Sequence, residues 1–228
     1  MKILLVAATE LEIEPFLNKL SYPDKTSDYH KRYRVGNASV DVLVTGVGMM
    51  VTAYRLGQRF ATEKYDYAIN AGICGSFTRS FRIGDVVEIT EDCVSELGAE
   101  DRDRFLTIFD LGLIDPENPP YMKGKLVNSL PIRSQILERL HKVKGITVNT
   151  VHGNSATISR IKELFDPQTE SMEGAAFLYG CLLEKIPNIQ IRAISNYVEE
   201  RNRSRWNLDL ALKNLNKSLL ELIKEIAV

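Results

Sequence analysis

Apolar residues recur along the chain in two spacings. Short continuous apolar runs, typical of buried strands, cover Ile3–Ala8, Ser39–Thr45, Tyr67–Asn70, Asp85–Thr90, Ile146–Val151 and Ile189–Ser195. Apolar residues three or four positions apart predict helices over Glu10–Leu20, Met49–Thr62, Ser134–Lys142, Glu170–Lys185 and Leu208–Ile226. This alternation predicts an α/β fold with a largely buried central sheet.

The least regular stretch runs from Glu96 to Pro131 and is rich in proline. We expect much of it to form loops over one edge of a site. Gly72 and Gly75 predict a glycine turn after the strand that begins at Tyr67. The chain has no internal repeat, low-complexity tract or linker, so residues 1–228 are predicted to form a single domain.

Composition narrows the class of protein. The chain carries 29 basic and 30 acidic residues, for a net charge of -1, so nucleic acid and anionic membrane surfaces are not expected partners. The apolar run at the N-terminus stops before Glu10, which favours a first strand over a signal peptide. The three cysteines and three histidines are scattered, which predicts reduced thiols, no metal site and a cytoplasmic protein.

Polar residues follow several of the predicted strands. They occupy Thr9–Glu12, Gly46–Gly48, Gly72–Ser76, His152–Asn154 and Ser195–Glu199. In open α/β sheets, ligands bind beyond the carboxyl ends of the strands. We therefore expect these five segments to meet at one rim.

Three motifs contain candidate chemistry. Glu10, Glu12 and Glu14 alternate, so on a helix they cannot share a face; either one reaches the pocket as a general base or all form an acidic first turn. Glu173 lies among apolar and small residues, where a carboxylate is paired or faces a ligand unless it is exposed in a first helical turn. Asn196 ends a buried strand and either contacts a ligand or starts a turn.

Taken in order, these motifs resemble the purine nucleoside phosphorylase and nucleosidase superfamily. The resemblance rests on MKILLVAATELE, VTGVGMMVTAYRL, INAGICGSF, GDVVEITED, TVHGNSAT, SMEGAAF and IRAISNYVEER. The most similar subgroups are the methylthioadenosine/adenosylhomocysteine nucleosidases and the futalosine hydrolases. The resemblance implies a three-layer α/β/α sandwich with a mixed central sheet, no metal or organic cofactor, and a homodimer or higher homo-oligomer with an interface near Met49–Tyr54.

The same resemblance assigns roles to individual residues. Glu12 is expected to activate water, while Met172 and Glu173 hold the ribose. The residues expected near base and sugar are Gly72, Ile73, Cys74, Asn154, Ser195 and Asn196. Acids after the first strand repel phosphate, which favours hydrolysis over phosphorolysis.

Asn196 stands where the methylthioadenosine nucleosidases carry an aspartate. Its amide offers one donor and one acceptor, which suits a 6-oxopurine and penalises adenine by about 1–3 kcal/mol. The segment Asn196–Trp206 is similar to that of futalosine hydrolases, and Arg201, Arg203 or Arg205 either reaches a substrate carboxylate or belongs to a solvated loop. The open alternatives are a methylthioadenosine/adenosylhomocysteine nucleosidase, a 6-oxopurine phosphorylase and a nucleoside-binding protein without catalysis.

Overall fold

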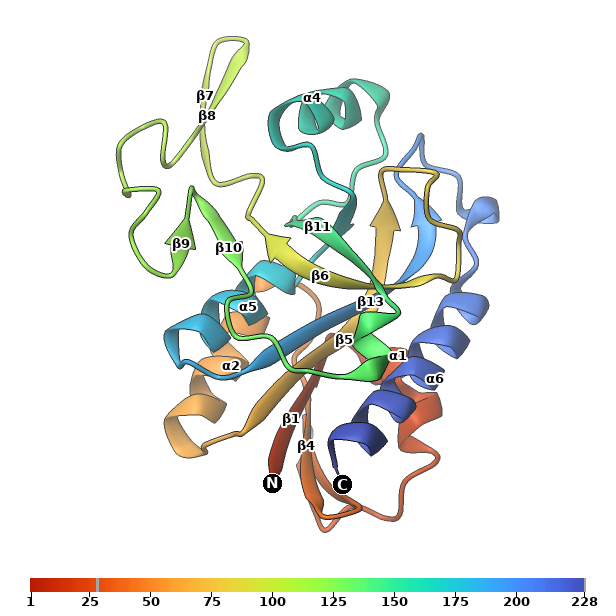
Figure 1. Ribbon diagram of the computed structural model, residues 1–228. Coiled ribbons are helices and arrows are strands. Elements are labelled where there is room, and N and C mark those ends of the chain that lie inside the picture. The colour runs from red at the N-terminus through yellow and green to blue at the C-terminus, as the bar shows by residue number, and fades with distance from the viewer. Residues whose placement is uncertain (28, 228) are drawn as a thin grey trace.

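A mixed sheet of eleven strands runs through the residues that the computed structural model describes, 1–27 and 29–227 (Figure 1). The strands of the sheet are β1 (Lys2–Ala7), β2 (Lys25–Ser27), β3 (His30–Val35), β4 (Ala38–Val44), β5 (Tyr67–Ser76), β6 (Val86–Asp92), β9 (Tyr121–Met122), β10 (Lys125–Val127), β11 (His141–Thr147), β12 (Thr169–Ser171) and β13 (Asn188–Tyr197). A separate hairpin contains β7 (Gly98–Asp101) and β8 (Arg104–Thr107). The helices are α1 (Glu10–Leu17), α2 (Met49–Thr62), α3 (Gln135–Glu138), α4 (Ser155–Phe165), α5 (Gly174–Leu183) and α6 (Leu208–Ile226), with a 3-10 turn at Arg203–Arg205.

Helices cover both faces of the sheet. On one face α1 and α6 pack on β1, β5 and β13 through a large apolar core that includes Phe16 and Leu219. On the other face α2 and α5 pack together through a core that includes Leu56 and Phe177 (Figure 1). The expected three-layer α/β/α sandwich with a mixed central sheet is therefore confirmed.

Strand pairing brings the polar segments to one end of the sheet. β4, β1, β5 and β13 are parallel neighbours, so their carboxyl ends point the same way. β12 pairs antiparallel with β5, and β5, β12, β11, β6 and β13 pair in a closed ring. The ends of β1, β5 and β13 thus meet close to β12, at the position expected of a ligand site.

Several of the predicted elements are wrong in extent, including the strand predicted over Ile146–Val151, where β11 ends at Thr147, and the helix predicted over Glu10–Leu20, which ends at Leu17. The strand that begins at Tyr67 continues through Gly72 and Gly75 to Ser76, so the expected glycine turn lies inside β5. The expected helix Ser134–Lys142 shrinks to the four residues of α3, and β11 begins at His141. Since β11 is held between β6 and β12, sheet pairing outweighs the helical spacing of this segment.

The predicted helix Glu170–Lys185 begins late, because Thr169–Ser171 pairs with β5 and β11 before α5 starts at Gly174. The stretch from Glu96 to Pro131 contains the β7–β8 and β9–β10 pairs as well as loops, and the β7–β8 hairpin projects away from the sheet (Figure 1). The predicted bounds of α2 and α6 are confirmed. Among the described residues, no helix is long and apolar enough to cross a membrane.

Candidate active site

A cavity of about 450 Å³ lies beyond the carboxyl ends of β1, β5 and β13. Its lining combines acidic, amide and hydroxyl side chains with aliphatic and aromatic ones. Seven of the predicted residues line it: Glu12, Ile73, Cys74, Met172, Glu173, Ser195 and Asn196. Residues that are far apart in the sequence are therefore brought together as the motifs predicted.

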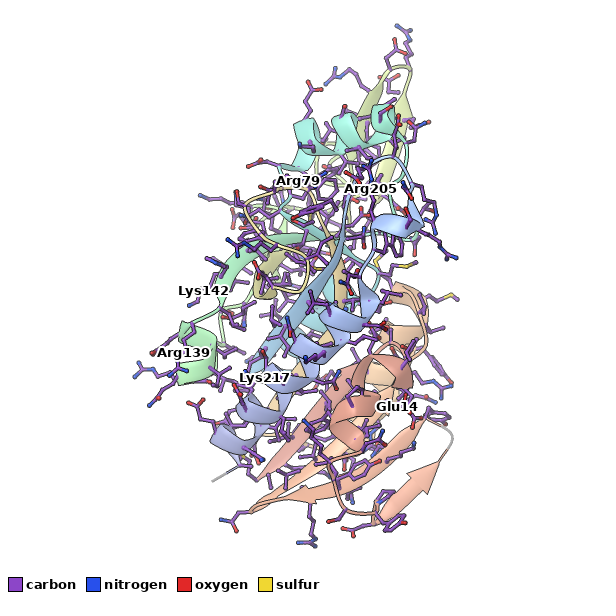
Figure 2. All side chains as sticks on the ribbon, turned by 90° about the vertical axis from the view of Figure 1, so that its right-hand side faces the viewer. Glu14, Arg79, Arg139, Lys142, Arg205 and Lys217 are labelled. Atoms are coloured by element: carbon purple, nitrogen blue, oxygen red, sulfur yellow. The ribbon has the colours of Figure 1, made fainter. Side chains whose placement is uncertain are left out.

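Glu12 occupies the inward face of the first turn of α1. Its side chain is 8 % exposed, whereas Glu10 and Glu14 are exposed and Glu14 lies on the outer side of the helix (Figure 2). Oε2 accepts from the backbone N–H of Thr9 at 3.0 Å, and Oε1 accepts from that of Ile73 at 3.1 Å. One carboxylate oxygen thus belongs to the helix cap and the other to β5, which fixes the plane of the group.

The pKa of Glu12 is raised above its usual range. Burial is the main cause, and the nearby charge of Glu173 adds to it. Arg192 and the backbone N–H groups of Thr9 and Ile73 act in the opposite direction. A carboxyl with a raised pKa is a stronger base than an exposed one, which suits the abstraction of a proton from water near neutral pH.

Asn216 on α6 locks the backbone of the helix that bears Glu12. It is 2 % exposed; its Nδ2 donates to the carbonyl of Glu12 at 2.8 Å and its Oδ1 accepts from the N–H of Phe16 at 2.9 Å. These are the two groups that an ordinary helical hydrogen bond would join. The inserted amide satisfies both next to Pro15, which fits the tendency of proline to disturb a helix.

Glu173 lies at the start of α5 and is 5 % exposed. Its Oε1 accepts from the N–H of Gly48 at 3.0 Å, and its Oε2 lies 3.5 Å from Nη1 of Arg192. Gly48 has φ +105°, a conformation that favours glycine, and it immediately precedes α2. The carboxylate is thus paired and faces the cavity, as its apolar surroundings predicted.

Arg192 is fully buried behind the cavity at the centre of β13. Its guanidinium donates to Asn70 and Gln190 and pairs with Glu173. A Cβ on Gly72 would stand 2.4 Å from Nη1 of Arg192 and 2.7 Å from Oε1 of Glu12. Gly72 is therefore required for the close approach of these two side chains, and two buried carboxylates share one guanidinium.

Ser195 and Asn196 give the cavity a part of its lining that is polar but uncharged. Oγ of Ser195 lies 2.8 Å from Oδ1 of Asn196 and 3.2 Å from the carbonyl of Cys74. Nδ2 of Asn196 donates to the carbonyl of Tyr197 at 3.1 Å. Burial raises the pKa of the Cys74 thiol to about 12, which disfavours the thiolate that a nucleophilic cysteine needs.

Asn154 and Arg201 do not line this cavity. They line an adjoining cavity of about 690 Å³, which shares Val151 with the first. The side chain of Asn154 caps α4 by accepting from Ala156 and Thr157. Arg203 lines the cavity of Glu12 instead, while Arg205 and Arg79 both pair with Glu199 on the surface (Figure 2).

Sequence reasoning missed Arg192, Glu170 and Trp206, all of which lie in or directly behind the cavity. An arginine between Ile191 and Ala193 in an otherwise apolar strand was an available signal, because such a charge must be paired. Among the described residues, no cluster of His, Cys, Asp and Glu could hold a metal ion.

These features define an α/β protein of the nucleoside phosphorylase and nucleosidase class. The chain belongs to the phosphorylase superfamily, whose model matches residues 2–224. A methylthioadenosine/S-adenosylhomocysteine nucleosidase of Maridesulfovibrio salexigens is 29 % identical over 99 % of this chain and 100 % of that protein. A futalosine hydrolase of Acidothermus cellulolyticus is 28 % identical over 81 % of this chain and 75 % of that protein.

The fold likeness extends to solved structures. A methylthioadenosine/S-adenosylhomocysteine nucleosidase of Neisseria meningitidis, in complex with methylthio-immucillin-A, superposes with a TM-score of 0.80. It covers 98 % of each chain at 18 % identity. Within the phosphorylase superfamily the chain is thus similar to both kinds of nucleosidase.

Proposed function

We propose that the protein is a futalosine hydrolase, which cleaves the N-glycosidic bond of futalosine with water and releases hypoxanthine and dehypoxanthine futalosine for menaquinone biosynthesis. The observation that carries this proposal is Asn196 in a cavity that also contains Glu12 and Glu173. Amide chemistry at the base end suits a 6-oxopurine, because Nδ2 can donate to O6. Two carboxylates at the sugar end suit the positive charge that develops on the ribose.

In this proposal Glu12 accepts a proton from the attacking water while the bond between C1′ and the purine breaks. Glu173 accepts from the ribose hydroxyls, Met172 packs on the sugar, and Ile73 and Cys74 form the floor, while Gly72 does not line the cavity and instead makes room for Glu12 and Arg192. Asn196, positioned beside Ser195, contacts the purine. Since an amide cannot supply a proton, the departing base takes its proton from water. Positioned acid–base groups of this kind contribute on the order of 100- to 10,000-fold.

Charge supports water over phosphate as the nucleophile. Glu12 and Glu173 both face the cavity, and Arg192 behind them already pairs with Glu173. Among the described lining residues Arg203 is the one cation, and it lies with Trp206 and Leu208. A phosphate dianion near Glu12 would therefore meet like charge without a free cationic partner.

The part of the cavity beside α6 suits the 5′ substituent of futalosine. Trp206, Leu208 and Leu212 give it an aromatic and aliphatic wall, and Arg203 adds a cation that can pair with a benzoate carboxylate. Cζ of Arg201 lies 5.4 Å from the centroid of the Trp206 ring, and Arg201 lines the adjoining cavity with Asn154, so it is the second candidate for that carboxylate.

The second candidate function is that of a methylthioadenosine/S-adenosylhomocysteine nucleosidase. The relative from Maridesulfovibrio salexigens favours it, because the similarity covers both chains almost completely. The same cavity would then bind methylthioadenosine with the amide of Asn196 in the opposite orientation, Nδ2 toward N7 and Oδ1 toward the 6-amino group of adenine. The two functions thus differ at the base and at the 5′ substituent.

The test is a substrate panel. Purified protein is incubated with futalosine, inosine and methylthioadenosine separately, with and without phosphate, and the free base is followed by chromatography. Hypoxanthine from futalosine without phosphate supports the proposal. Adenine from methylthioadenosine would replace it with the second candidate, and release that depends on phosphate would make the protein a phosphorylase.

We also infer that the protein is a cytoplasmic homodimer or higher homo-oligomer. Val47, Met50 and Tyr54 are 56 %, 81 % and 64 % exposed, and they lie together before and on the first turns of α2. Apolar side chains grouped in this way are typical of a subunit interface. Light scattering of the wild type and of Met50→Glu tests this, because the charged variant should shift the mass toward the monomer.

A further inference from the structure

Gly75 lies between two polar side chains in a row that crosses three strands. It pairs with Glu170 of β12 on one side and with Asn196 of β13 on the other. A Cβ on Gly75 would stand 2.9 Å from Cγ2 of Val198, 3.3 Å from Nδ2 of Asn196 and 3.5 Å from Cγ of Glu170. Glycine thus lets these side chains pack closely over β5. The side chains of Glu170 and Asn196 lie on either side of Gly75, and all three of these residues line the cavity.

Glu170 is held firmly in this position. It is 4 % exposed; its Oε1 accepts from the backbone N–H of His152 at 3.0 Å, and its Oε2 lies 2.6 Å from Nδ1 of the same histidine. The imidazole in turn contacts the ring of Phe77, with centroids 6.3 Å apart. Each carboxylate oxygen has two lone-pair positions, so the group retains acceptor capacity toward the cavity.

The side chains of Asn196 and Glu170 differ in the hydrogen bonds that they can form. Asn196 offers a donor and an acceptor, whereas a carboxylate accepts only. A 6-oxopurine presents an acceptor at O6 next to a donor at N1–H. Adenine presents a bare lone pair at N1, which a buried carboxylate repels. The pair of Asn196 and Glu170 is thus complementary to the O6 and N1 edge of a 6-oxopurine.

We propose that Glu170, held by His152, accepts a hydrogen bond from N1–H of the purine and is a specificity-determining residue for 6-oxopurines. This inference rests on the proposed function and extends it to a residue outside the acid–base machinery. Glu12 and Glu173 act on the sugar, whereas Glu170 recognises the base from the side of Gly75 opposite to Asn196.

The test measures binding of free bases, which needs no turnover. Hypoxanthine and adenine are titrated calorimetrically into the wild type and into Glu170→Gln, whose amide can donate to N1 of adenine. The wild type should prefer hypoxanthine, and the variant should lower this preference by about 10- to 100-fold. Glu88→Gln is the matched control, because Glu88 is 3 % exposed on β6 outside the cavity lining and should keep the preference.

An unchanged preference in folded Glu170→Gln would overturn the inference and leave the proposed function standing. A wild type that prefers adenine or binds neither base would overturn both. A second measurement uses the wild type alone: 1-methylhypoxanthine, which lacks N1–H, should bind at least about tenfold more weakly than hypoxanthine. Equal binding of the two bases would also overturn the inference.

Discussion

Two regions of the molecule each bury a carboxylate, Asp41 in one and Glu12 in the other, and the two pKa values are shifted in opposite directions. Asp41 on β4 is fully buried. Arg32, Arg59 and Tyr65 donate hydrogen bonds to its carboxylate oxygens, with donor–acceptor distances of 2.9 Å or less. Burial alone would raise the pKa of Asp41, but these hydrogen bonds, with that from His30, hold it well below its usual range. Glu12 is almost as buried, but there the cost of burying a charge outweighs the groups that lower the pKa, so the pKa of Glu12 is raised.

The difference lies in the donors available to each group. Asp41 receives two guanidinium groups and a phenol, so its charge is fully compensated and available for nothing else. Glu12 receives two backbone N–H groups, and the guanidinium behind it is shared with Glu173. Complete pairing therefore favours a structural carboxylate, whereas incomplete pairing leaves a carboxylate that can react.

The largest expected effect is on turnover. Glu12→Gln keeps the shape and the contacts with Thr9 and Ile73 partly intact but cannot accept a proton, so we expect kcat to fall on the order of 100- to 10,000-fold. Because an ionised, poorly compensated group is removed, the melting temperature should stay the same or rise. Steady-state kinetics and thermal unfolding measure the two quantities. Glu14→Gln on the outer side of α1 is the control. An undiminished kcat in Glu12→Gln would show that Glu12 is not the general base.

The converse change affects stability. Asp41→Asn leaves the cations of Arg32 and Arg59 without their buried partner, which should lower the free energy of unfolding by about 3–5 kcal/mol. The kcat of the folded fraction should not change, since the cluster lies outside the cavity lining. Urea unfolding measures the loss. Glu10→Gln, which breaks the surface pair with Lys31, should cost less than about 1 kcal/mol; equal losses would contradict the comparison.

A smaller effect is expected from the amide that supports the active carboxylate. Asn216→Leu removes two buried hydrogen bonds from the side chain of Asn216 to the backbone of α1, at a cost of about 1–3 kcal/mol. It should also lower kcat, because the helix that positions Glu12 relaxes. Asn214→Leu is the matched control: Asn214 on the same helix donates to Gly84, so its loss should reduce stability alone. A normal kcat in folded Asn216→Leu would show that the clamp does not position Glu12.

The smallest effect is a pH dependence of opposite sign in the two regions. The folded pKa of Asp41 is depressed, so its contribution to stability is complete above the ordinary aspartate pKa and is lost as pH falls below it. The folded pKa of Glu12 is raised, so its ionisation reduces stability as pH rises through and above 4.5, while activity requires that ionisation. In a plot of kcat/KM against pH, we expect the acidic side to fall about tenfold per pH unit, with an apparent pKa above 4.5. An apparent pKa at or below 4.5 would contradict the raised pKa of Glu12.

Much of the site was predictable because its chemistry follows strands in the sequence. Glu12 and Asn196 come after apolar runs, Met172 and Glu173 come directly before one, and parallel strand ends converge. The amphipathic helices α2 and α6 were predicted to the residue because one face of each packs on the sheet.

The errors fall where tertiary contacts outweigh local pattern. Gly72 and Gly75 suggest a turn in sequence, but inside β5 they provide room for Arg192 and Glu12 and for Glu170 and Asn196. The compensation of Asp41 was equally hidden, because Arg32, Arg59 and Tyr65 come from three separate segments. Pairing of this kind depends on the fold as a whole.

The contact between Asn216 and Glu12 also has a consequence for the order of folding. The two residues are 204 positions apart in the sequence. The carbonyl of Glu12 and the N–H of Phe16 gain their buried amide partner only when α6 docks on α1. Docking of α6 is therefore a late, long-range folding step on which the placement of the Glu12 side chain depends.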